Sequence, residues 1–405
     1  MPEIANRVRP KDQKERLAAL EPLLPKFAER RRELDESAAF PAQNFAELRA
    51  AGLLCGSVPT EFGGDGFWWT NFTDYYDIYE RIAAVDSSTA QLYQIQTHGA
   101  GMLAWHATPA QRQKYLPDVL QKGLLIASVG SEADVAAKGP EAGRAELRET
   151  PSGWRVTCHK HFASMAPGAD YMLIWVAVPG EGSWGDRQLW VLVPRDAPGV
   201  ELIDEWDTMG MRATVSWAVK LTEYEVPDDA IIGKPGAWAS DPRTFTLGYV
   251  TNHLGTAEGA FTLIKDYLRE RKYLADNPIL RFAIGDISSE LAVVRAALYT
   301  CAAQWEDAAA HDWDPDRVQQ AEVLGLQALH VSKRVALSVS SRAFEICGAR
   351  SSFKSFPFDM IYRDIRTFTL HHRDFDYMAR VADAVLDGTD KAALGSYLTP
   401  GSGVA

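Results

Sequence analysis

Two adjacent histidines near the C-terminal end, His371 and His372, have side chains suited to proton transfer. An imidazole titrates near neutral pH, so it can donate, accept or relay a proton. If both residues lie on one helix, their side chains point about 100° apart, and only one of them can face a given site. The alternative is a structural histidine that caps or packs the final helix. The sequence leaves open which of the two is the active one.

Two arginines have surroundings that suit the binding of a phosphate. Arg350 follows Gly348-Ala349 and precedes Ser351-Ser352. A guanidinium beside small residues and hydroxyls can hold a phosphate through paired hydrogen bonds. Arg271 belongs to the charged run at 269–272. Each has a simpler alternative, which is a surface salt bridge for Arg350 and a charged helix end for Arg271.

The sequence does not support several other classes of function. The four cysteines lie far apart without a CxxC pair, so neither a zinc site nor a disulfide framework is expected. His159 and His161 would need a third ligand to bind a metal, and we expect them to be surface or packing residues. A net charge of -12 without a long basic run disfavours nucleic acid. The polar start and the lack of a long apolar run predict a soluble, cytoplasmic protein with no membrane segment.

The elements that must position these residues fall into three parts. Helical spacing of apolar residues dominates the first third, with helices expected at 72–82, at 87–105 and from Thr108-Pro109 onward. Short Val-, Ile-, Trp- and Tyr-rich runs then predict strands. Four long helical segments follow and predict a bundle. The expected strands are 124–131, 153–158, 170–178, 188–193 and 217–226, and the expected bundle helices are 242–273, 279–309, 315–347 and 358–387.

The predicted fold class is therefore mainly α with a central β domain. We expect an N-terminal helical domain over residues 1–122, a small β-barrel over 123–235 and a C-terminal four-helix bundle over 236–405. This order, and the segments at the joints, resemble the acyl-CoA dehydrogenase family over roughly residues 15–387. The resembling segments are VPTEFGG (58–64), GWRVTCHKHFASMAPGADYMLIWV (153–176), WDTMGMRATVSWAVKLTEYEVPDDAIIG (206–233) and CGARSSFKSFPFDMIYRDIRTFTLHH (347–372).

One feature of the dehydrogenases is missing. In that family the segment after the Tyr-Arg-Asp motif supplies a glutamate that removes the α-proton of the substrate. Here residues 369–373 (TLHHR) contain no carboxylate, and neither do residues 243–257, where a subset of the family places its base. A positioned base usually contributes about 10²–10⁴-fold to the rate, so ordinary acyl-CoA dehydrogenation is not expected.

The TLH sequence instead resembles the flavin-dependent monooxygenase branch of the family. By this resemblance His371 matches the active-site histidine of the branch, and Arg350 matches its flavin-phosphate arginine. Ser164 matches a serine near the flavin ring, and Trp206 an aromatic residue beside it. The spacings agree, with 42 residues from Ser164 to Trp206 and 21 from Arg350 to His371. Phe162 would face the flavin from the same β-segment as Ser164.

Two segments depart from the pattern of the branch. A histidine is usual in the helix after residue 87, and here Gln96 occupies the matching place with His98 two residues later. The sequence leaves open which of them lines that wall. Ser128 and Ser131 lie in a segment that replaces the glycine-rich loop of the dehydrogenases, and we expect them to contact the flavin.

The resemblance implies a two-component monooxygenase. A separate reductase would supply the reduced flavin, which is FMN in preference to FAD. The reduced flavin would react with dioxygen to form a C4a-(hydro)peroxyflavin, and this would oxygenate a small organic substrate. It also implies a homotetramer in which Arg271 reaches the flavin of a neighbouring subunit. The alternatives are an FAD-dependent acyl-CoA dehydrogenase with a displaced base and a flavin- or ligand-binding relative without turnover. Sulfur heterocycles, indole-like or phenolic aromatics, and amines all remain open as substrates.

Overall fold

Helices fill the N-terminal part of the chain in the computed structural model, which describes residues 12–132 and 143–387. The central helix α5 begins behind Asp86, whose side chain accepts a hydrogen bond from the N–H of Ser88. The next helix, α6, begins with a capping box between Thr108 and Gln111. Both starts agree with the sequence prediction. The helices are α1 (Gln13–Leu20), α2 (Leu24–Ser37), α3 (Ala42–Ala50), α4 (Thr73–Val85), α5 (Ser87–His106) and α6 (Pro109–Lys122), with a short 3-10 turn η1 (Thr60–Phe62).

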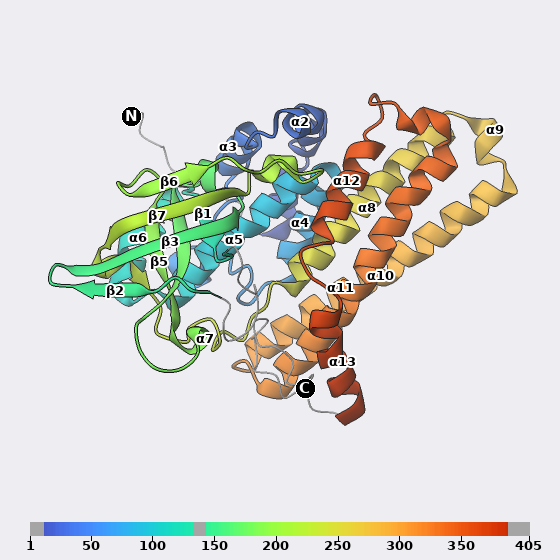
Figure 1. The fold of residues 1–405 in the computed structure, drawn as a ribbon. Helices are drawn as coiled ribbons and strands as arrows, with labels where there is room; N and C mark the ends of the chain where they lie inside the picture. Colours follow the sequence, from blue (N-terminus) through green and yellow to red (C-terminus); the bar gives the residue numbers. More distant parts are fainter. Residues whose placement is uncertain (1–11, 133–142, 388–405) are drawn as a thin grey trace.

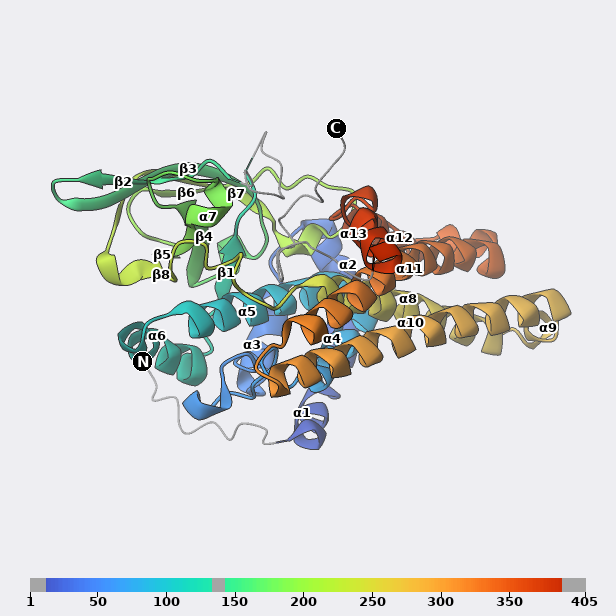
Figure 2. The ribbon, with the colours of Figure 1, turned by 90° about the horizontal axis from the view of Figure 1, so that it is seen from below.

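The central domain contains two four-stranded sheets that lie as two layers in Figure 2. One has the order β1 (Ile126–Val129), β4 (Tyr171–Ala177), β5 (Gln188–Pro194), β8 (Ile231–Ile232), and the other β2 (Leu147–Thr150), β3 (Gly153–Ala163), β7 (Trp217–Val226), β6 (Val200–Ile203). Isolated bridges join the layers, between Glu132 and Lys160 and between Glu146 and Ala177. The strands predicted from the sequence are all present. Short helical turns η2 (Ala166–Gly168), α7 (Trp184–Arg187), η3 (Arg212–Thr214) and η4 (Asp228–Ala230) connect them.

The register of β3 against β7 shifts between Lys160 and Ala163. Phe162 lies within this irregularity and has a positive φ of 54°, which is a strained conformation for an aromatic residue. A bulge of this kind bends a strand and changes where a side chain points. As a result, the Phe162 ring is 66% exposed, although the alternation of buried Val156, Cys158 and Lys160 would place residue 162 on the buried face.

Long helices form the C-terminal bundle, beside the β-domain in Figure 1. They are α8 (Thr246–Arg269), α10 (Pro278–Ala310) and α11 (Pro315–Cys347), with the short α9 (Lys272–Ala275) and a 3-10 turn η5 (Ala349–Ser352). Asn277 and Asp314 cap α10 and α11 immediately before a proline. Central helix α5 packs against α4, α8 and β1, so it touches all three parts of the molecule.

The fourth long helix was predicted wrongly as one continuous segment over 358–387. The structure has two helices, α12 (Phe358–Phe368) and α13 (Phe375–Asp387), with a turn at residues 369–374 between them. This turn contains His371 and His372, so the two histidines do not lie on a helix. Within residues 12–132 and 143–387, every helix is too short or too polar to cross a membrane.

Candidate flavin and oxygen site

The β-domain brings together three of the residues predicted to contact flavin. The ring of Phe162 meets that of Trp206 edge to face, with centroids 6.0 Å apart. The hydroxyls of Ser164 and Ser216 share a hydrogen bond of 2.8 Å, and Ser216 shares another of 2.8 Å with Thr214. These contacts place the exposed ring of Phe162 two residues before a row of linked hydroxyls that is buried, with Ser164 8% exposed.

The Met211 carbonyl connects this row to Trp206. It accepts hydrogen bonds from the indole Nε1 of Trp206 at 3.1 Å and from the Thr214 hydroxyl at 2.8 Å. The Met211 N–H donates to the carboxylate of Asp364 in α12, at 2.6 Å. The segment that bears Trp206 is thereby fixed to the helix that leads to His371.

Ser131 and Ser128 lie on the neighbouring sheet edge. The Ser131 carbonyl accepts a hydrogen bond of 2.9 Å from the N–H of His161, which places Ser131 beside the Phe162 bulge. The Ser128 hydroxyl accepts a hydrogen bond of 3.1 Å from the indole of Trp175. Ser131 therefore adjoins the Phe162 and Trp206 cluster, whereas Ser128 contacts a tryptophan of its own sheet.

The two histidines of the 369–374 turn differ in burial. His371 is exposed, and its ring lies 5.1 Å from that of Tyr249 and 5.5 Å from that of Phe368. His372 is only 7% exposed and meets Tyr249 edge to face at 4.3 Å. From its exposed position the His371 imidazole can reach a cofactor and exchange protons with it, whereas the His372 ring packs against Tyr249. This difference favours His371 as the reactive histidine.

Gln96 and His98 both lie in α5, and the structure gives them different surroundings. The Gln96 amide donates to the carbonyls of Leu54 and Leu124, and its oxygen accepts from the N–H of Ile126 at 2.7 Å. Gln96 is therefore a structural residue that joins α5 to the start of β1. His98 is 8% exposed. Its ring nitrogen Nε2 is buried and has no hydrogen-bond partner in the described part of the chain.

His98 lies in an aromatic environment. It contacts Phe245 and meets Trp68 and Trp238 edge to face, with centroids 5.1 Å and 6.4 Å away. Burial lowers the pKa of His98 well below its ordinary value, and the nearby Arg243 charge lowers it further. Its imidazole is therefore neutral at physiological pH. Phe245 precedes α8 by one residue and Tyr249 lies one turn later, so His98 and His371 contact the same end of that helix.

A buried ion pair beside this wall was not anticipated from the sequence. Arg243 is fully buried, and its guanidinium bonds the carboxylate of Asp241 at 2.6 and 2.8 Å while lying 4.1 Å from the ring centres of Trp68 and Trp105. His106 contacts the same carboxylate at 3.0 Å. Although burial alone would raise the pKa of Asp241, the Arg243 charge holds it below its ordinary value. The only signal in the sequence is an Asp-Pro-Arg tripeptide, which is common in surface turns.

Arg271 and Arg350 lie at the opposite end of the bundle. The Arg271 guanidinium donates to the Tyr267 carbonyl at 3.0 Å and stacks on the Tyr267 ring at 3.8 Å. Arg350 is exposed in η5, before α12. The 11 residues of α12 separate η5 from the His371 turn, a rise of about 16 Å. Figures 1 and 2 show α9 at the end of the bundle that points away from the β-domain. Within one chain, these arginines and His371 do not form a single site.

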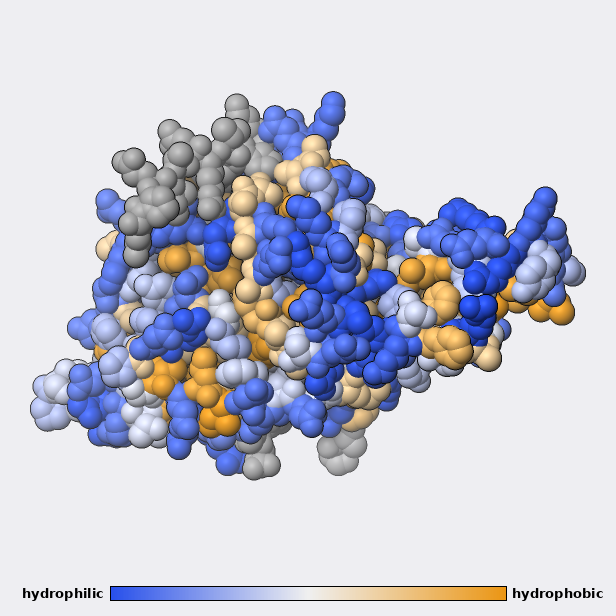
Figure 3. Space-filling model, turned by 90° about the horizontal axis from the view of Figure 1, so that it is seen from above, coloured by the Kyte–Doolittle hydropathy of each residue, from blue (hydrophilic) through white to orange (hydrophobic). Residues whose placement is uncertain are grey.

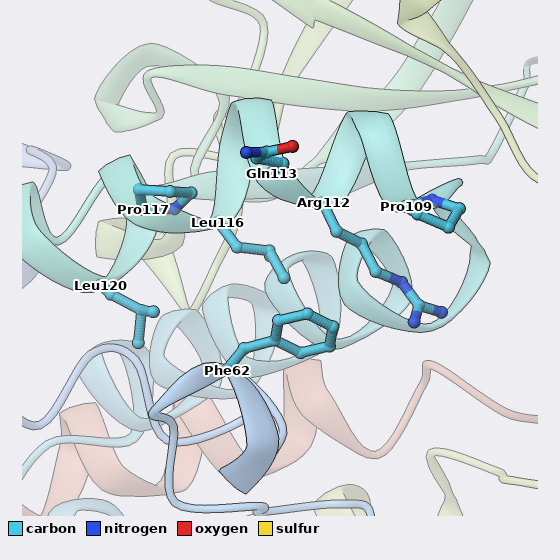
Figure 4. Close-up of a pocket in the computed structure, with 7 residues that line it drawn as sticks. All are labelled: Phe62, Pro109, Arg112, Gln113, Leu116, Pro117 and Leu120. Atoms are coloured by element: carbon cyan, nitrogen blue, oxygen red, sulfur yellow. The ribbon is translucent and has the colours of Figure 1, made fainter.

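Other features lie outside this site. Among residues 12–132 and 143–387, no cluster of three or more His, Cys, Asp or Glu side chains could hold a metal ion. The His159 and His161 rings lie 4.4 Å apart, and His161 contacts Glu205 at 2.8 Å. An apolar groove of about 500 Å³ runs along α6, where Phe62 faces Leu116 and Arg112 (Figure 4). None of the predicted site residues lines this groove.

Comparison with known protein families identifies the family of this chain. Residues 13–122 match the acyl-CoA dehydrogenase N-terminal domain, and residues 247–373 match the acyl-CoA dehydrogenase C-terminal domain. The chain belongs to the acyl-CoA dehydrogenase family. Its fold agrees with that of the dibenzothiophene monooxygenase TdsC from Paenibacillus sp. A11-2, solved with FMN and indole, at a TM-score of 0.84 and 24% identity over 94% of this chain and 99% of that one.

Known monooxygenases are also similar to this chain in amino-acid sequence. A dibenzothiophene monooxygenase of Mycolicibacterium goodii is 25% identical over 381 residues, covering 88% of this chain and 89% of its own. The protein named "Probable FMNH2-dependent monooxygenase SfnC" of Pseudomonas putida is 26% identical over 375 residues, covering 88% and 90%. The chain is thus a homologue of flavin-dependent monooxygenases, which are oxidoreductases.

Proposed function

We propose that this chain is the oxygenase component of a two-component monooxygenase that uses reduced FMN and dioxygen to oxygenate a small organic substrate. The observation that carries the proposal is the exposed imidazole of His371 where a dehydrogenase needs a carboxylate base. The carboxylate closest in sequence, Asp374, is bound to the ammonium of Lys333 and to the hydroxyl of Tyr377. A carboxylate held in this way is a poor base for an α-proton.

The residues of the β-domain fit a flavin. Isoalloxazine is flat and apolar with a polar rim, and the exposed Phe162 ring, the Trp206 indole and the linked hydroxyls of Ser164 and Ser216 offer matching surfaces. Reduced flavin supplies the electrons that activate dioxygen. In this proposal Phe162 and Trp206 contact the ring system, while Ser164 and Ser131 bind its rim and Ser128 supports the same edge.

In this proposal two histidines act in proton transfer and hydrogen bonding. The His371 imidazole can hold a proton at a ring nitrogen and deliver it beside the flavin, because this side chain is exposed. The neutral His98 ring, with its buried Nε2 atom, would offer the substrate one hydrogen-bonding position in an otherwise aromatic wall. Trp68, Trp238 and Phe245 would exclude water from that wall.

Arg271 and Arg350 would act on a flavin held by another subunit. The 11 residues of α12, a rise of about 16 Å, separate Arg350 from the His371 turn of its own chain, and Arg271 immediately precedes α9 at the end of the bundle that points away from the β-domain. Exposed apolar side chains surround this end of the bundle, including Tyr273 at 76%, Ile279 at 75% and Phe282 at 75%. Apolar patches are visible on the projecting arm in Figure 3. We therefore propose a homotetramer in which the arginines of one chain bind the flavin phosphate beside another.

Oxygen uptake tests the proposal directly. Purified protein would be supplied with NADH, a flavin reductase and FMN, and tested with dibenzothiophene, indole and a primary amine as substrates. We expect oxygenated product from at least one of these classes and colourless protein on purification. The competing function is an FAD-dependent acyl-CoA dehydrogenase with a displaced base. Yellow protein that holds FAD tightly and oxidises acyl-CoA under nitrogen would establish that function instead.

A further inference from the structure

The turn between α12 and α13 is held by contacts with α11. Lys333 of α11 is 9% exposed, and its ammonium donates a hydrogen bond of 2.6 Å to the backbone carbonyl of His372. The same ammonium forms an ion pair with the carboxylate of Asp374. One buried cation thus binds the chain one residue and three residues after His371.

Asp374 completes a small network around Lys333. Its carboxylate also accepts a hydrogen bond of 2.8 Å from the Tyr377 hydroxyl and lies 3.0 Å from the Nδ1 atom of His330. Burial opposes ionisation of Asp374, but the contacts with Lys333, Tyr377 and His330 together outweigh it and lower the pKa of Asp374 below its ordinary value. The pair is therefore charged on both sides, and neither partner can be removed without leaving the other poorly compensated.

This network accounts for the break in the predicted helix. A helix through residues 369–374 would direct the His372 carbonyl to a backbone N–H four residues later. Lys333 binds that carbonyl instead, so the chain turns after Phe368 and resumes as a helix at Phe375. The turn leaves His371 exposed beside Tyr249, while His372 is buried against the same ring and lies 5.6 Å from the His371 ring.

We propose that Lys333 is a positioning residue for oxygen transfer, which holds the 369–374 turn so that His371 faces the reacting flavin. The inference rests on the proposed monooxygenase function. Lys333 is too buried to reach a substrate and acts through the backbone of the turn. A misplacement of a catalytic group by about 1 Å can cost on the order of 10²-fold in rate, so the loss of this contact should be visible in catalysis.

The test compares Lys333→Met, Lys333→Arg and the matched control Arg334→Met, which alters an exposed cation on the same turn of α11. Each protein is loaded with FMNH2 and mixed with oxygen, first without substrate and then with the panel compound that wild type oxygenates best. Hydrogen peroxide and product are quantified per oxygen consumed. Circular dichroism and thermal unfolding verify that each variant is folded.

For Lys333→Met we expect peroxide release to speed up and product per oxygen to fall roughly 10- to 100-fold, while the Km for the substrate changes little. Lys333→Arg should recover part of the coupling, because a guanidinium can donate to both acceptors, and Arg334→Met should match wild type. If Lys333→Met does not fold, Asp374→Asn, which leaves the lysine in place, is expected to show the same uncoupling.

Three different results would contradict the inference. Folded Lys333→Met or Asp374→Asn with wild-type coupling would overturn the role of Lys333 and leave the monooxygenase function standing. Loss of coupling that Lys333→Arg and Arg334→Met share equally would also overturn it, because it would show a general effect of altering α11. Wild type that forms no product with any panel compound, but oxidises acyl-CoA, would overturn the proposed function and this inference with it.

Discussion

The carboxylate of Asp364 accepts a hydrogen bond of 2.6 Å from the backbone N–H of Met211, 153 residues earlier in the chain. This contact joins α12 to the segment that bears Trp206, and so connects the bundle side of the candidate site to the flavin side. The pKa of Asp364 is raised to about 7, chiefly because the carboxyl is buried and also because of the charges of Asp35 and Asp86, while the Met211 N–H opposes the rise.

The raised pKa of Asp364 predicts a stability that falls as the pH rises. Between its ordinary value of 3.8 and about 7, the folded protein binds a proton at Asp364 that the unfolded chain has released. The free energy of unfolding should therefore decrease with pH in this window, by up to about 1.4 kcal/mol per unit from this group. Urea unfolding at pH 5 and 7 measures the difference, and Asp364→Asn should reduce it. Equal slopes for both proteins would contradict the assignment.

The two histidines of the turn are distinguished by a pair of variants. His371→Ala should fold normally and still consume oxygen with FMNH2, because the side chain is exposed. Product should fall by about 10²-fold or more, with peroxide released instead, since a positioned proton-transfer group is lost. His372→Ala should lower thermal stability through its contact with Tyr249. Full coupling in His371→Ala would exclude it as the reactive histidine.

The proposed role of Arg350 in binding a phosphate predicts which flavin the enzyme uses. FMNH2 should support turnover better than FADH2, because a terminal phosphate can end at this guanidinium. Arg350→Met should raise the FMN concentration needed for half-maximal activity roughly 10-fold or more, the scale of a lost charge-assisted hydrogen bond. Lys354→Met, a nearby exposed cation, serves as the control. Tight binding of oxidised FAD with no response to FMN would be the opposite result.

The exposed apolar end of the bundle predicts self-association. Light scattering at micromolar concentration should give the mass of a tetramer. Phe282→Asp, at a side chain that is 75% exposed, should shift that mass downward and raise the FMN requirement together, because in the proposed tetramer each flavin site includes arginines of a neighbouring chain. Phe62→Asp, in the groove along α6, should change neither. A monodisperse wild-type monomer would contradict the composite site.

Gln96 is expected to contribute to stability and not to chemistry. Gln96→Leu leaves the Ile126 N–H and the Leu54 and Leu124 carbonyls without their side-chain partner. Each buried group left unpaired costs about 1–3 kcal/mol, so the free energy of unfolding should fall by at least about 2 kcal/mol. Gln113→Leu, on the exposed side of α6, is the control. If activity falls while stability is unchanged, Gln96 belongs to the site.

Local rules in the sequence predicted most of the framework. The starts of α5, α6, α10 and α11 follow from Asp86, Thr108, Asn277-Pro278 and Asp314-Pro315, because a cap satisfies N–H groups within a few residues of itself. Runs of β-branched and aromatic residues between turns predicted β1, β3, β4, β5 and β7, whereas the short strands β2, β6 and β8 were not predicted. The segments at the domain joints are long enough for their residues alone to indicate the family fold.

Contacts between residues far apart in the sequence decided the rest. The segment Thr369–Asp374 contains no glycine or proline, and it leaves the helix because Lys333 binds it from 39 residues away. The Phe162 ring is exposed because β3 and β7 pair out of register. Arg243 is buried because three tryptophan rings surround it. Such arrangements depend on which side chains meet after the chain has folded, and spacing along one segment does not encode that.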